Sequence, residues 1–422
     1  MKLLQSNSND EALEQEKPSW FATACLAFFF SVSGYSLLAG EVIDSAIATN
    51  GILLLGVAAA FMPYLYCGRR FTARPALSQA RVAIAGICLS ALATAFFIVI
   101  EDETRSDVLR VCFFKTGGLC VMAAAVAYAA PLYRPREVTF ALLAFVASEL
   151  LVISASFVFL HVEFNANTIG SRTSTIGLIT VACFSPFIVR AAGFCGSLVI
   201  SIVLQCRTSA VATGATLMIA SIETKSRRAR FAVVISVILL GGILGMFADD
   251  AQREIKQLAI RHLGSKHFVA QFFLGDKNRA KIDSDLLDRG RVWKASIKQI
   301  KRRPVLGFGV GTEMKRFKYR SHNAYLSVAI EGGIIFLIAW ILLYVLALTR
   351  MLHWGWSEQF ADLVAGRAMI YLLSYMLLSA MVESSGLGSI SSPVNVVFLF
   401  LLFWTSQWFD PNRLSTEATS WS

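Results

Sequence analysis

Charged residues are scarce in this chain of 422 residues. Asp, Glu, Lys and Arg together make up 16% of the sequence, whereas hydrophobic residues make up 56%. The mean hydropathy of +0.60 is typical of integral membrane proteins, although the isoelectric point of 9.4 could also suggest nucleic-acid binding. The sequence contains no zinc-finger spacing, basic leucine zipper or RNA-recognition motif, so we expect no nucleic-acid partner.

Several catalytic and metal-binding signatures are also missing. There is no GxSxG elbow, HExxH helix or Walker loop, and the eight cysteines form no CxxC pair. All eight lie in or beside predicted membrane spans, so no disulfide framework is expected. Glu101, Asp102 and Glu103 keep a metal-dependent enzyme open, but solvated charges of a short loop are the simpler interpretation. We therefore predict neither a metal nor a cofactor.

Apolar runs recur along the chain and predict an all-α integral membrane protein with about twelve transmembrane helices. A helix needs about 20 apolar residues to cross the hydrocarbon core of a bilayer. The predicted spans are 19–39, 46–66, 82–100, 108–130, 139–160, 176–190, 191–206, 208–222, 231–248, 325–348, 368–384 and 392–409. Whether the short spans 176–190 and 191–206, separated only by the region of Arg190, fully cross the membrane is left open.

Charges in the short loops predict how these helices are oriented. Short loops rich in Lys and Arg stay in the cytoplasm. Such loops contain Arg69, Arg70, Arg74 and Arg81, then Arg134 and Arg136, then Lys225, Arg227, Arg228 and Arg230. Both termini are then cytoplasmic, and the loop 249–322 lies on the opposite side of the membrane. The predicted organisation is a tail at 1–18, nine helices in 19–248, the loop 249–322, three helices in 323–409 and a tail at 410–422.

The segment 249–322, which we call the basic loop, holds most of the net charge. It contains 18 Lys and Arg against 8 Asp and Glu, or +10 of the formal +11. Within it, Asp285 to Arg302 is predicted to be an amphipathic helix on the membrane surface. Its apolar stripe is Leu286, Trp293, Ile297 and Ile300, with Lys294, Lys298 and Lys301 outside the stripe.

The sequence GFGVG follows this predicted helix. Pro304 is expected to end the helix, and Gly307, Gly309 and Gly311 permit tight backbone turns that other residues resist. Glycine spacing alone favours a plain turn over a phosphate cradle.

His322 lies just before a helix that is predicted to begin near Tyr325. An unperturbed imidazole has a pKa of about 6.5, which suits it to take a proton from a sugar hydroxyl near neutral pH. The alternative is a histidine that caps the helix at the interface. The adjacent Asn323 is a candidate substrate contact.

Arg207 and Arg291 are candidates for binding a diphosphate. A planar guanidinium group can donate two parallel hydrogen bonds to phosphate oxygens. Arg207 lies between two apolar runs and Arg291 lies in the basic loop. A snorkelling arginine and a solvated loop charge are the respective alternatives.

Lys115 and Glu149 are both predicted to lie inside adjacent membrane helices. A salt bridge between them is the favoured interpretation, because an isolated charge is costly in the membrane. Arg110, nearer the surface, and Lys115 are further candidate contacts to a substrate phosphate.

The succession RGRVW, RRPVLGFGVG and SHNAYLSVAIEGGIIFL resembles the signature region of the bacterial O-antigen ligase and O-antigen polymerase superfamily. QCRTSAVA is similar to the arginine segment that follows the family's central hairpin, and FNANTIGS to its preceding asparagine-containing loop. The resemblance covers about His161 to Leu342 and is strongest over Gly290–Leu337. The chain departs from the pattern at Arg289, where the family usually has serine or threonine.

This resemblance implies a C-type glycosyltransferase fold and a metal-independent, inverting transfer. The donor would be a glycan on undecaprenyl diphosphate at the periplasmic face of the bacterial inner membrane. His322 would activate the acceptor hydroxyl, while Arg207 and Arg291 would bind the departing diphosphate.

The resemblance leaves the acceptor open between a growing polysaccharide and lipid A core, the substrates of a polymerase and a ligase in exopolysaccharide or lipopolysaccharide biosynthesis. Membrane lipids and other polysaccharide assembly proteins would be partners. A transporter of lipid-linked glycans and a non-catalytic scaffold are the alternatives.

Overall fold

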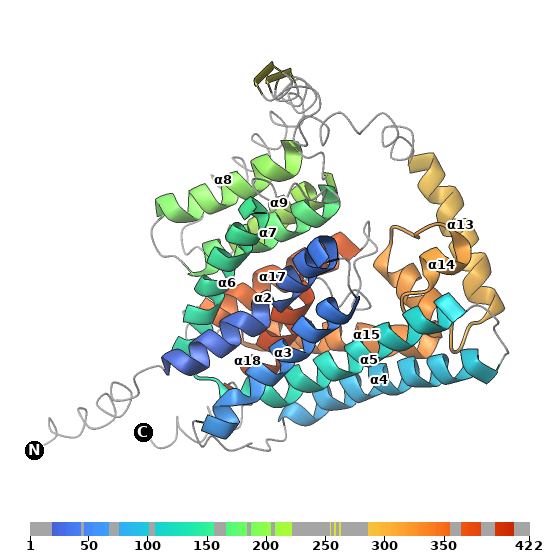
Figure 1. Ribbon diagram of the computed structural model, residues 1–422. Helices are drawn as coiled ribbons and strands as arrows, with labels where there is room; N and C mark the ends of the chain where they lie inside the picture. The colour runs from blue at the N-terminus through green and yellow to red at the C-terminus, as the bar shows by residue number, and fades with distance from the viewer. Residues whose placement is uncertain are drawn as a thin grey trace, which may run out of the picture.

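The computed structural model describes residues 19–43, 46–66, 76–100, 106–155, 166–183, 187–203, 207–221, 286–354, 364–380 and 393–408, with 254, 257–258 and 261–262. Every regular element in these residues is a helix, which confirms the predicted all-helical class (Figure 1). The tails, the span 231–248, most of 249–285 and the loop charges at 69–74, 101–103 and 225–230 lie outside the described residues.

The first helices are α2 (Trp20–Ile43), α3 (Ala46–Tyr66), α4 (Ala76–Ile100), α5 (Ser106–Ala129), the 3-10 turn η1 (Ala130–Leu132) and α6 (Pro135–Ala155). They are followed by α7 (Ala166–Cys183), α8 (Phe187–Val203) and α9 (Arg207–Ser221). The remaining helices are α13 (Leu286–Arg302), α14 (Glu313–Phe317), α15 (Ala324–Trp354), α17 (Val364–Ala380) and α18 (Pro393–Trp408).

Four of the described helices are long and apolar enough to cross a membrane. The candidate segments are Arg81–Val99, Val108–Leu132, Arg136–Ser154 and Ala324–Thr349. Shorter apolar stretches occupy Trp20–Val32, Gly51–Tyr66, Ala192–Ser201, Gly366–Ala380 and Asn395–Thr405. Large apolar side chains such as Leu89, Phe96 and Leu151 point outward, as expected of helices that face lipid. These features agree with a helical membrane protein, and the number of twelve spans stays a prediction.

Three positions differ from those predicted. Helix α7 begins at Ala166 rather than 176. Its first half contains polar residues such as Arg172 and Thr173, which interrupt the apolar pattern but are buried against other helices. Arg190, expected between two spans, lies within α8. Arg81, expected in a loop, lies in α4 with its guanidinium 5.1 Å from the centroid of a tyrosine ring on α5.

Aromatic side chains pack in the apolar core between α2 and α18. Phe30 and Phe400 make an edge-to-face contact with their ring centroids 5.0 Å apart. Next to them the Tyr133 hydroxyl donates to the carbonyl of Ala60 at 2.9 Å, and Trp404 donates to the carbonyl of Tyr133 at 2.9 Å. These bonds satisfy the polar ends of large buried rings, so the segment before α6 is held firmly to the core.

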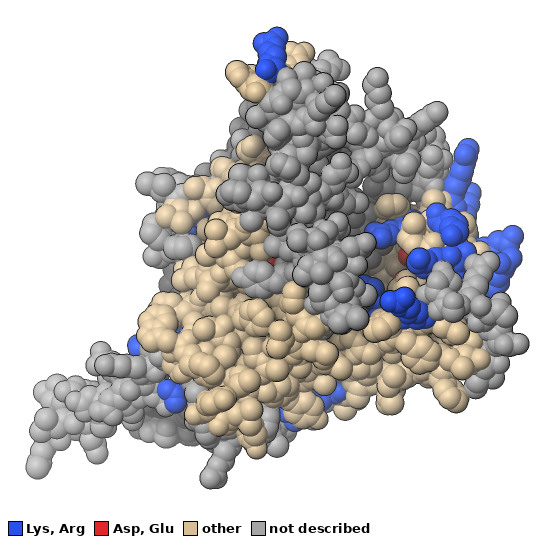
Figure 2. All heavy atoms as spheres, in the orientation of Figure 1, with Lys and Arg blue, Asp and Glu red and all other residues tan. Residues whose placement is uncertain are grey.

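The basic part of the chain forms a separate region. Helices α13 and α14 lie to one side of the bundle, beside the beginning of α15 and the ends of α4 and α5 (Figure 1). Lys and Arg side chains gather over this region, whereas the rest of the visible described face is mainly uncharged (Figure 2). The positive charge of the sequence is therefore concentrated in space as well as along the chain.

Candidate functional site

Helix α13 confirms the predicted amphipathic helix. It ends at Arg302, shortly before Pro304. Trp293 is half-buried, but the predicted apolar stripe is wrong at Ile297, which is 45% exposed, while Ser296 is fully buried. The reason is that α13 packs on α15 through the side that carries Trp293 and Ser296. Exposed cations cover its outer side: Arg291, Lys294, Lys298, Lys301 and Arg302.

The GFGVG sequence forms the predicted turn, which we call the glycine turn (residues 307–311). Gly307, Gly309 and Gly311 have φ angles of 68°, 105° and 77°, values that residues with a side chain rarely adopt. A Cβ on Gly307 would lie 2.6 Å from the carbonyl oxygen of Ile330. Close backbone packing is therefore one reason for the glycines here.

Helix α15 is broken at Gly333, where φ is 72° and ψ is −170°. The break leaves carbonyls of its first segment available to the glycine turn. Phe308 donates its N–H to the carbonyl of Ile330 at 2.8 Å, and Gly309 donates to the carbonyl of Glu331 at 2.7 Å. The glycine turn is thus bonded to the backbone of a candidate membrane helix.

The glycine turn also contacts α4 and α5. Thr94 of α4 donates its hydroxyl to the carbonyl of Leu306 at 2.5 Å, just before the turn. Lys115 of α5 is exposed rather than buried, and its side chain lies against Gly311. Lys115, a predicted substrate contact, and the glycine turn are therefore neighbours.

His322 lies at the start of α15, as predicted. It is half-buried and adopts a left-handed backbone conformation with φ of 50°. Helix α15 begins at Ala324, and Asn323 caps it by accepting the N–H of Leu326 at 3.1 Å. The side chain that caps the helix is therefore Asn323, and a direct contact of Asn323 with substrate stays a prediction.

Glu313 is a feature of this region that the sequence analysis missed. Its carboxylate is buried and accepts the N–H of Ser321 at 2.7 Å and the hydroxyl of Ser327 at 2.8 Å. Burial raises the pKa of Glu313, and the hydrogen bonds from the two serines oppose that rise. One signal was present: Glu313 is the single acidic residue among ten Lys and Arg between 290 and 320.

A hydrogen bond joins α13 to the segment that carries His322. The indole N–H of Trp293 donates to the carbonyl of Ser321 at 2.9 Å. Arg291 lies two residues before Trp293 on the same helix and is exposed. The structure therefore places the helix of Arg291 in direct contact with the residue that precedes His322.

Some basic side chains of this region have structural partners. The guanidinium groups of Arg303 and Arg316 lie 4.9 and 5.6 Å from the ring centroid of Phe308. Arg316 also donates from Nε to the Phe308 carbonyl at 3.1 Å. These two arginines stabilise the glycine turn and are half-buried, whereas Arg291 on α13 is more exposed to a ligand.

Arg207 is the first residue of α9, and its side chain lies outside the described residues. Its predicted pairing with Arg291 on a diphosphate therefore stays a prediction. Arg110 is exposed on α5 with its guanidinium 5.9 Å from the ring centroid of Phe114. Its contact with substrate is likewise a prediction.

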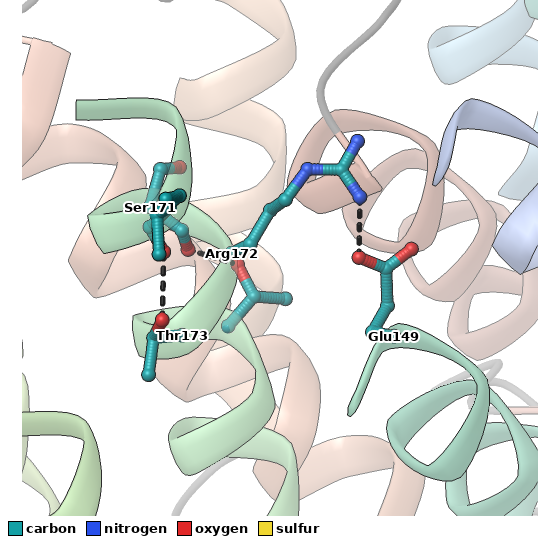
Figure 3. A network of polar contacts seen from close by, with 6 residues as sticks. Glu149, Ser171, Arg172 and Thr173 are labelled. Carbon is teal, nitrogen blue, oxygen red and sulfur yellow. Dashed lines mark hydrogen bonds and ion pairs between the residues drawn. The ribbon is translucent and has the colours of Figure 1, made fainter. Parts of the chain in front are cut away.

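The predicted salt bridge between Lys115 and Glu149 is wrong. Glu149 of α6 pairs with Arg172 of α7, with an N to O distance of 2.5 Å, and both side chains are buried (Figure 3). Lys115 is instead exposed within α5 and lies against the glycine turn. The buried ion pair is thus a contact inside the helix bundle, separate from the residues around His322.

No group of three or more His, Cys, Asp and Glu side chains in the described part of the chain is arranged to hold a metal ion. The metal-independent reaction that the resemblance implies stays a prediction.

Comparison with known proteins matches one part of the chain. No curated protein matches the chain. Residues 165–341 match the family model described as O-antigen ligase, a range that includes Arg207, Arg291, the glycine turn and His322. This match confirms, over residues 165–341, the resemblance to the O-antigen ligase and O-antigen polymerase superfamily.

Proposed function

We propose that this protein transfers a glycan from undecaprenyl diphosphate to an acceptor hydroxyl at the periplasmic face of the bacterial inner membrane. The family match supports glycan transfer in polysaccharide biosynthesis, and the long apolar helices support a membrane location. One observation carries the proposal within the site. His322 lies half-buried at the start of a candidate membrane helix, bonded through Ser321 to a helix whose outer side is covered with cations.

The proposed reaction exchanges one bond of the sugar for another. The bond between the anomeric carbon and the diphosphate oxygen breaks, and a bond from that carbon to the acceptor oxygen forms with inversion. His322 takes the proton of the acceptor hydroxyl, since a neutral imidazole can accept it near neutral pH. Undecaprenyl diphosphate leaves with the bonding electron pair.

Cations are proposed to stabilise the charge that develops on the leaving diphosphate. Arg291 on α13 and Arg207 at the start of α9 are assigned this role, because guanidinium groups bind phosphate oxygens in pairs. Lys115, Arg110 and Asn323 are further candidate contacts. Lys115 is the best placed of these, since it is exposed and lies against the glycine turn.

The choice of acceptor separates two versions of the proposal. A polymerase transfers the glycan to a second lipid-linked glycan, whereas a ligase transfers it to lipid A core. Supplying membranes with either acceptor alone and analysing the product distinguishes the two.

The decisive experiment replaces His322 with alanine in membranes that are supplied with lipid-linked glycan. We expect glycan transfer to be lost and binding of the donor to be retained. His262→Ala is a matched control, because His262 is exposed in another part of the chain. Normal transfer by His322→Ala removes the proposed base, and movement of the glycan across vesicles without a new glycosidic bond favours a transporter.

The role of Arg291 is tested on the same helix. Arg291→Ala should weaken donor binding and slow transfer, while Arg291→Lys should recover only part of the loss because a lysine cannot make the paired hydrogen bonds. Arg302→Ala is the control, since Arg302 is also an exposed cation of α13 and contacts Gln299. Equal donor affinity and rate in Arg291→Ala and the wild type would remove the assigned role.

A further inference from the structure

The backbone of Ser321, the residue before His322, is held on both sides. Its N–H donates to Oε1 of Glu313 at 2.7 Å, and its carbonyl accepts the indole N–H of Trp293 at 2.9 Å. Ser321 is fully buried. Rotation of the chain at this point would break two bonds that water cannot replace, so the direction in which the chain enters His322 is fixed.

The residues after His322 are held by the same carboxylate. Oε2 of Glu313 accepts the hydroxyl of Ser327 at 2.8 Å, in the first turns of α15. Between the two serines, Ser321 donates its hydroxyl to the carbonyl of Asn323 at 3.0 Å. One buried carboxylate therefore bonds to the chain on each side of His322.

His322 needs such support because of its own backbone conformation. Its φ of 50° lies in the left-handed region, which is unfavourable for a residue with a side chain. A conformation of this kind persists only where the surrounding structure holds it, and such residues concentrate at functional sites. The bonds from Ser321 to Glu313 and from Trp293 to Ser321 hold the chain directly beside it.

We propose that Glu313 is the positioning residue for His322. It acts through the backbone of Ser321 and the hydroxyl of Ser327, and it orients the imidazole toward the acceptor without touching substrate. This inference rests on the proposed glycan transfer, because it assigns to Glu313 the placement of the base of that reaction.

The test compares kcat and KM for the lipid-linked donor in Glu313→Ala and in wild type. Misplacing a catalytic group by about 1 Å costs roughly a hundredfold in rate, so we expect kcat to fall by about tenfold to a hundredfold. The KM for the donor should change by less than about threefold, because Glu313 is not proposed to bind it. Rates are normalised to folded protein measured by size-exclusion chromatography and thermal unfolding.

Glu313→Gln is the conservative variant that keeps the test valid if alanine prevents folding. Its amide oxygen can accept the N–H of Ser321, and its amide NH2 can donate to Ser327. Most of the kcat should therefore return. Trp293→Phe removes only the donor to Ser321 and should lower kcat in the same direction, by less than Glu313→Ala.

Glu137→Ala is a matched control at another site. Glu137 is equally buried and accepts two backbone N–H groups, those of Ser19 and Arg134. We expect this variant to lose stability while kcat per folded molecule stays at the wild-type value. A kcat in Glu313→Ala equal to that of wild type, or a loss of kcat as large in Glu137→Ala, overturns the positioning role.

A second measurement separates failure of this inference from failure of the proposed function. Diethyl pyrocarbonate modifies neutral imidazoles, and mass spectrometry of the peptide that contains His322 gives its rate without any transfer reaction. Glu313→Ala should raise that rate and Glu313→Gln should not. If wild type makes no glycosidic bond, the proposed function fails, and an unchanged modification rate in Glu313→Ala overturns the anchoring of His322 independently.

Discussion

Two buried carboxylates, Glu137 and Glu313, hold the chain in similar ways near opposite ends of α5. Glu137 accepts the N–H groups of Ser19 and Arg134 at 3.0 and 2.9 Å. Glu313 accepts Ser321 and Ser327 at 2.7 and 2.8 Å. The α5 helix contacts the glycine turn near Cys112 and ends at Ala129, and a rise of about 1.5 Å per residue separates these points by about 25 Å.

The difference between them lies in what each anchors. Glu137 is in the first turn of α6 and bonds back to Arg134, which is the arrangement of a helix cap, and it ties α6 to the start of α2. Glu313 bonds forward, to residues eight and fourteen positions along the chain, and these flank His322. The same chemistry thus stabilises a helix end in one place and the geometry of a candidate catalytic residue in the other.

The largest effect on stability is expected at a third buried carboxylate, Glu149, which is paired with the cation Arg172 and not with uncharged donors. Arg172→Ala leaves Glu149 as an uncompensated buried charge, which costs about 3–5 kcal/mol. Thermal unfolding in detergent measures the loss. The double variant Glu149→Leu with Arg172→Leu should be more stable than Arg172→Ala, and a double variant that is less stable would contradict the assigned ion pair.

A large effect confined to the Glu313 end is expected from Gly333→Ala. A Cβ at Gly333 would collide with the carbonyl of Val305, and its φ of 72° disfavours any side chain. The expected loss is about 1–3 kcal/mol or more, with faster hydrogen exchange at Ser321 but not at Arg134. Gly117→Ala on α5 is the control, because a Cβ there would meet no atom of another helix within 4 Å. Hydrogen exchange that becomes equally faster at Ser321 and Arg134 would show that the effect is not confined to the Glu313 end.

A smaller effect is expected at the Glu137 end. Glu137→Ala removes the acceptor of two part-buried N–H groups, and because water can reach them we expect a total cost of about 1 kcal/mol, the low end for an unmade hydrogen bond. Hydrogen exchange should quicken at Arg134 and Ser19 and stay unchanged at Ser321. Faster exchange at Ser321 would show that the two ends are coupled.

The smallest effect is a dependence on pH at the Glu313 end. Burial raises the pKa of Glu313 above its usual value of 4.5, while Arg320 opposes the rise and Glu331 lies nearby. A raised pKa of a carboxyl means that the folded state binds its proton more readily than the unfolded state. Wild type should therefore lose stability relative to Glu313→Gln as the pH rises through the folded pKa.

Thermal unfolding of wild type and Glu313→Gln between pH 5 and pH 8 or so measures this difference. We expect the unfolding temperature of Glu313→Gln to increase relative to that of wild type as the pH rises. A gap that does not change with pH contradicts the raised pKa.

The elements around His322 could be predicted from the sequence because each has a local signal. The spacing of apolar residues predicted α13, Pro304 its end, and the three glycines the turn at 307–311. These signals act over a few residues and depend little on neighbouring helices. The predicted face of α13 failed at Ile297, because which side is buried depends on how α13 meets α15.

Pairings between distant residues could not be predicted in the same way. A salt bridge between Glu149 and Lys115 was predicted because both lie inside predicted membrane helices, but this does not specify how each helix is rotated or which helix packs beside it. The start of α7 was also placed too late, so Arg172 was not recognised as a buried residue. Glu313 was missed because its partners lie eight and fourteen residues away, beyond any local motif.

The amino-acid order by itself determined that the chain is apolar and helical, that its cations are concentrated before residue 322, and that a turn and a histidine precede α15. These properties follow from composition and from conformational preferences of single residues. Only the tertiary structure decided that Glu149 meets Arg172, that Lys115 meets the glycine turn, and that Glu313 and Trp293 hold Ser321. Such contacts arise when whole helices pack, since packing chooses among the many partners that charge and polarity alone would allow.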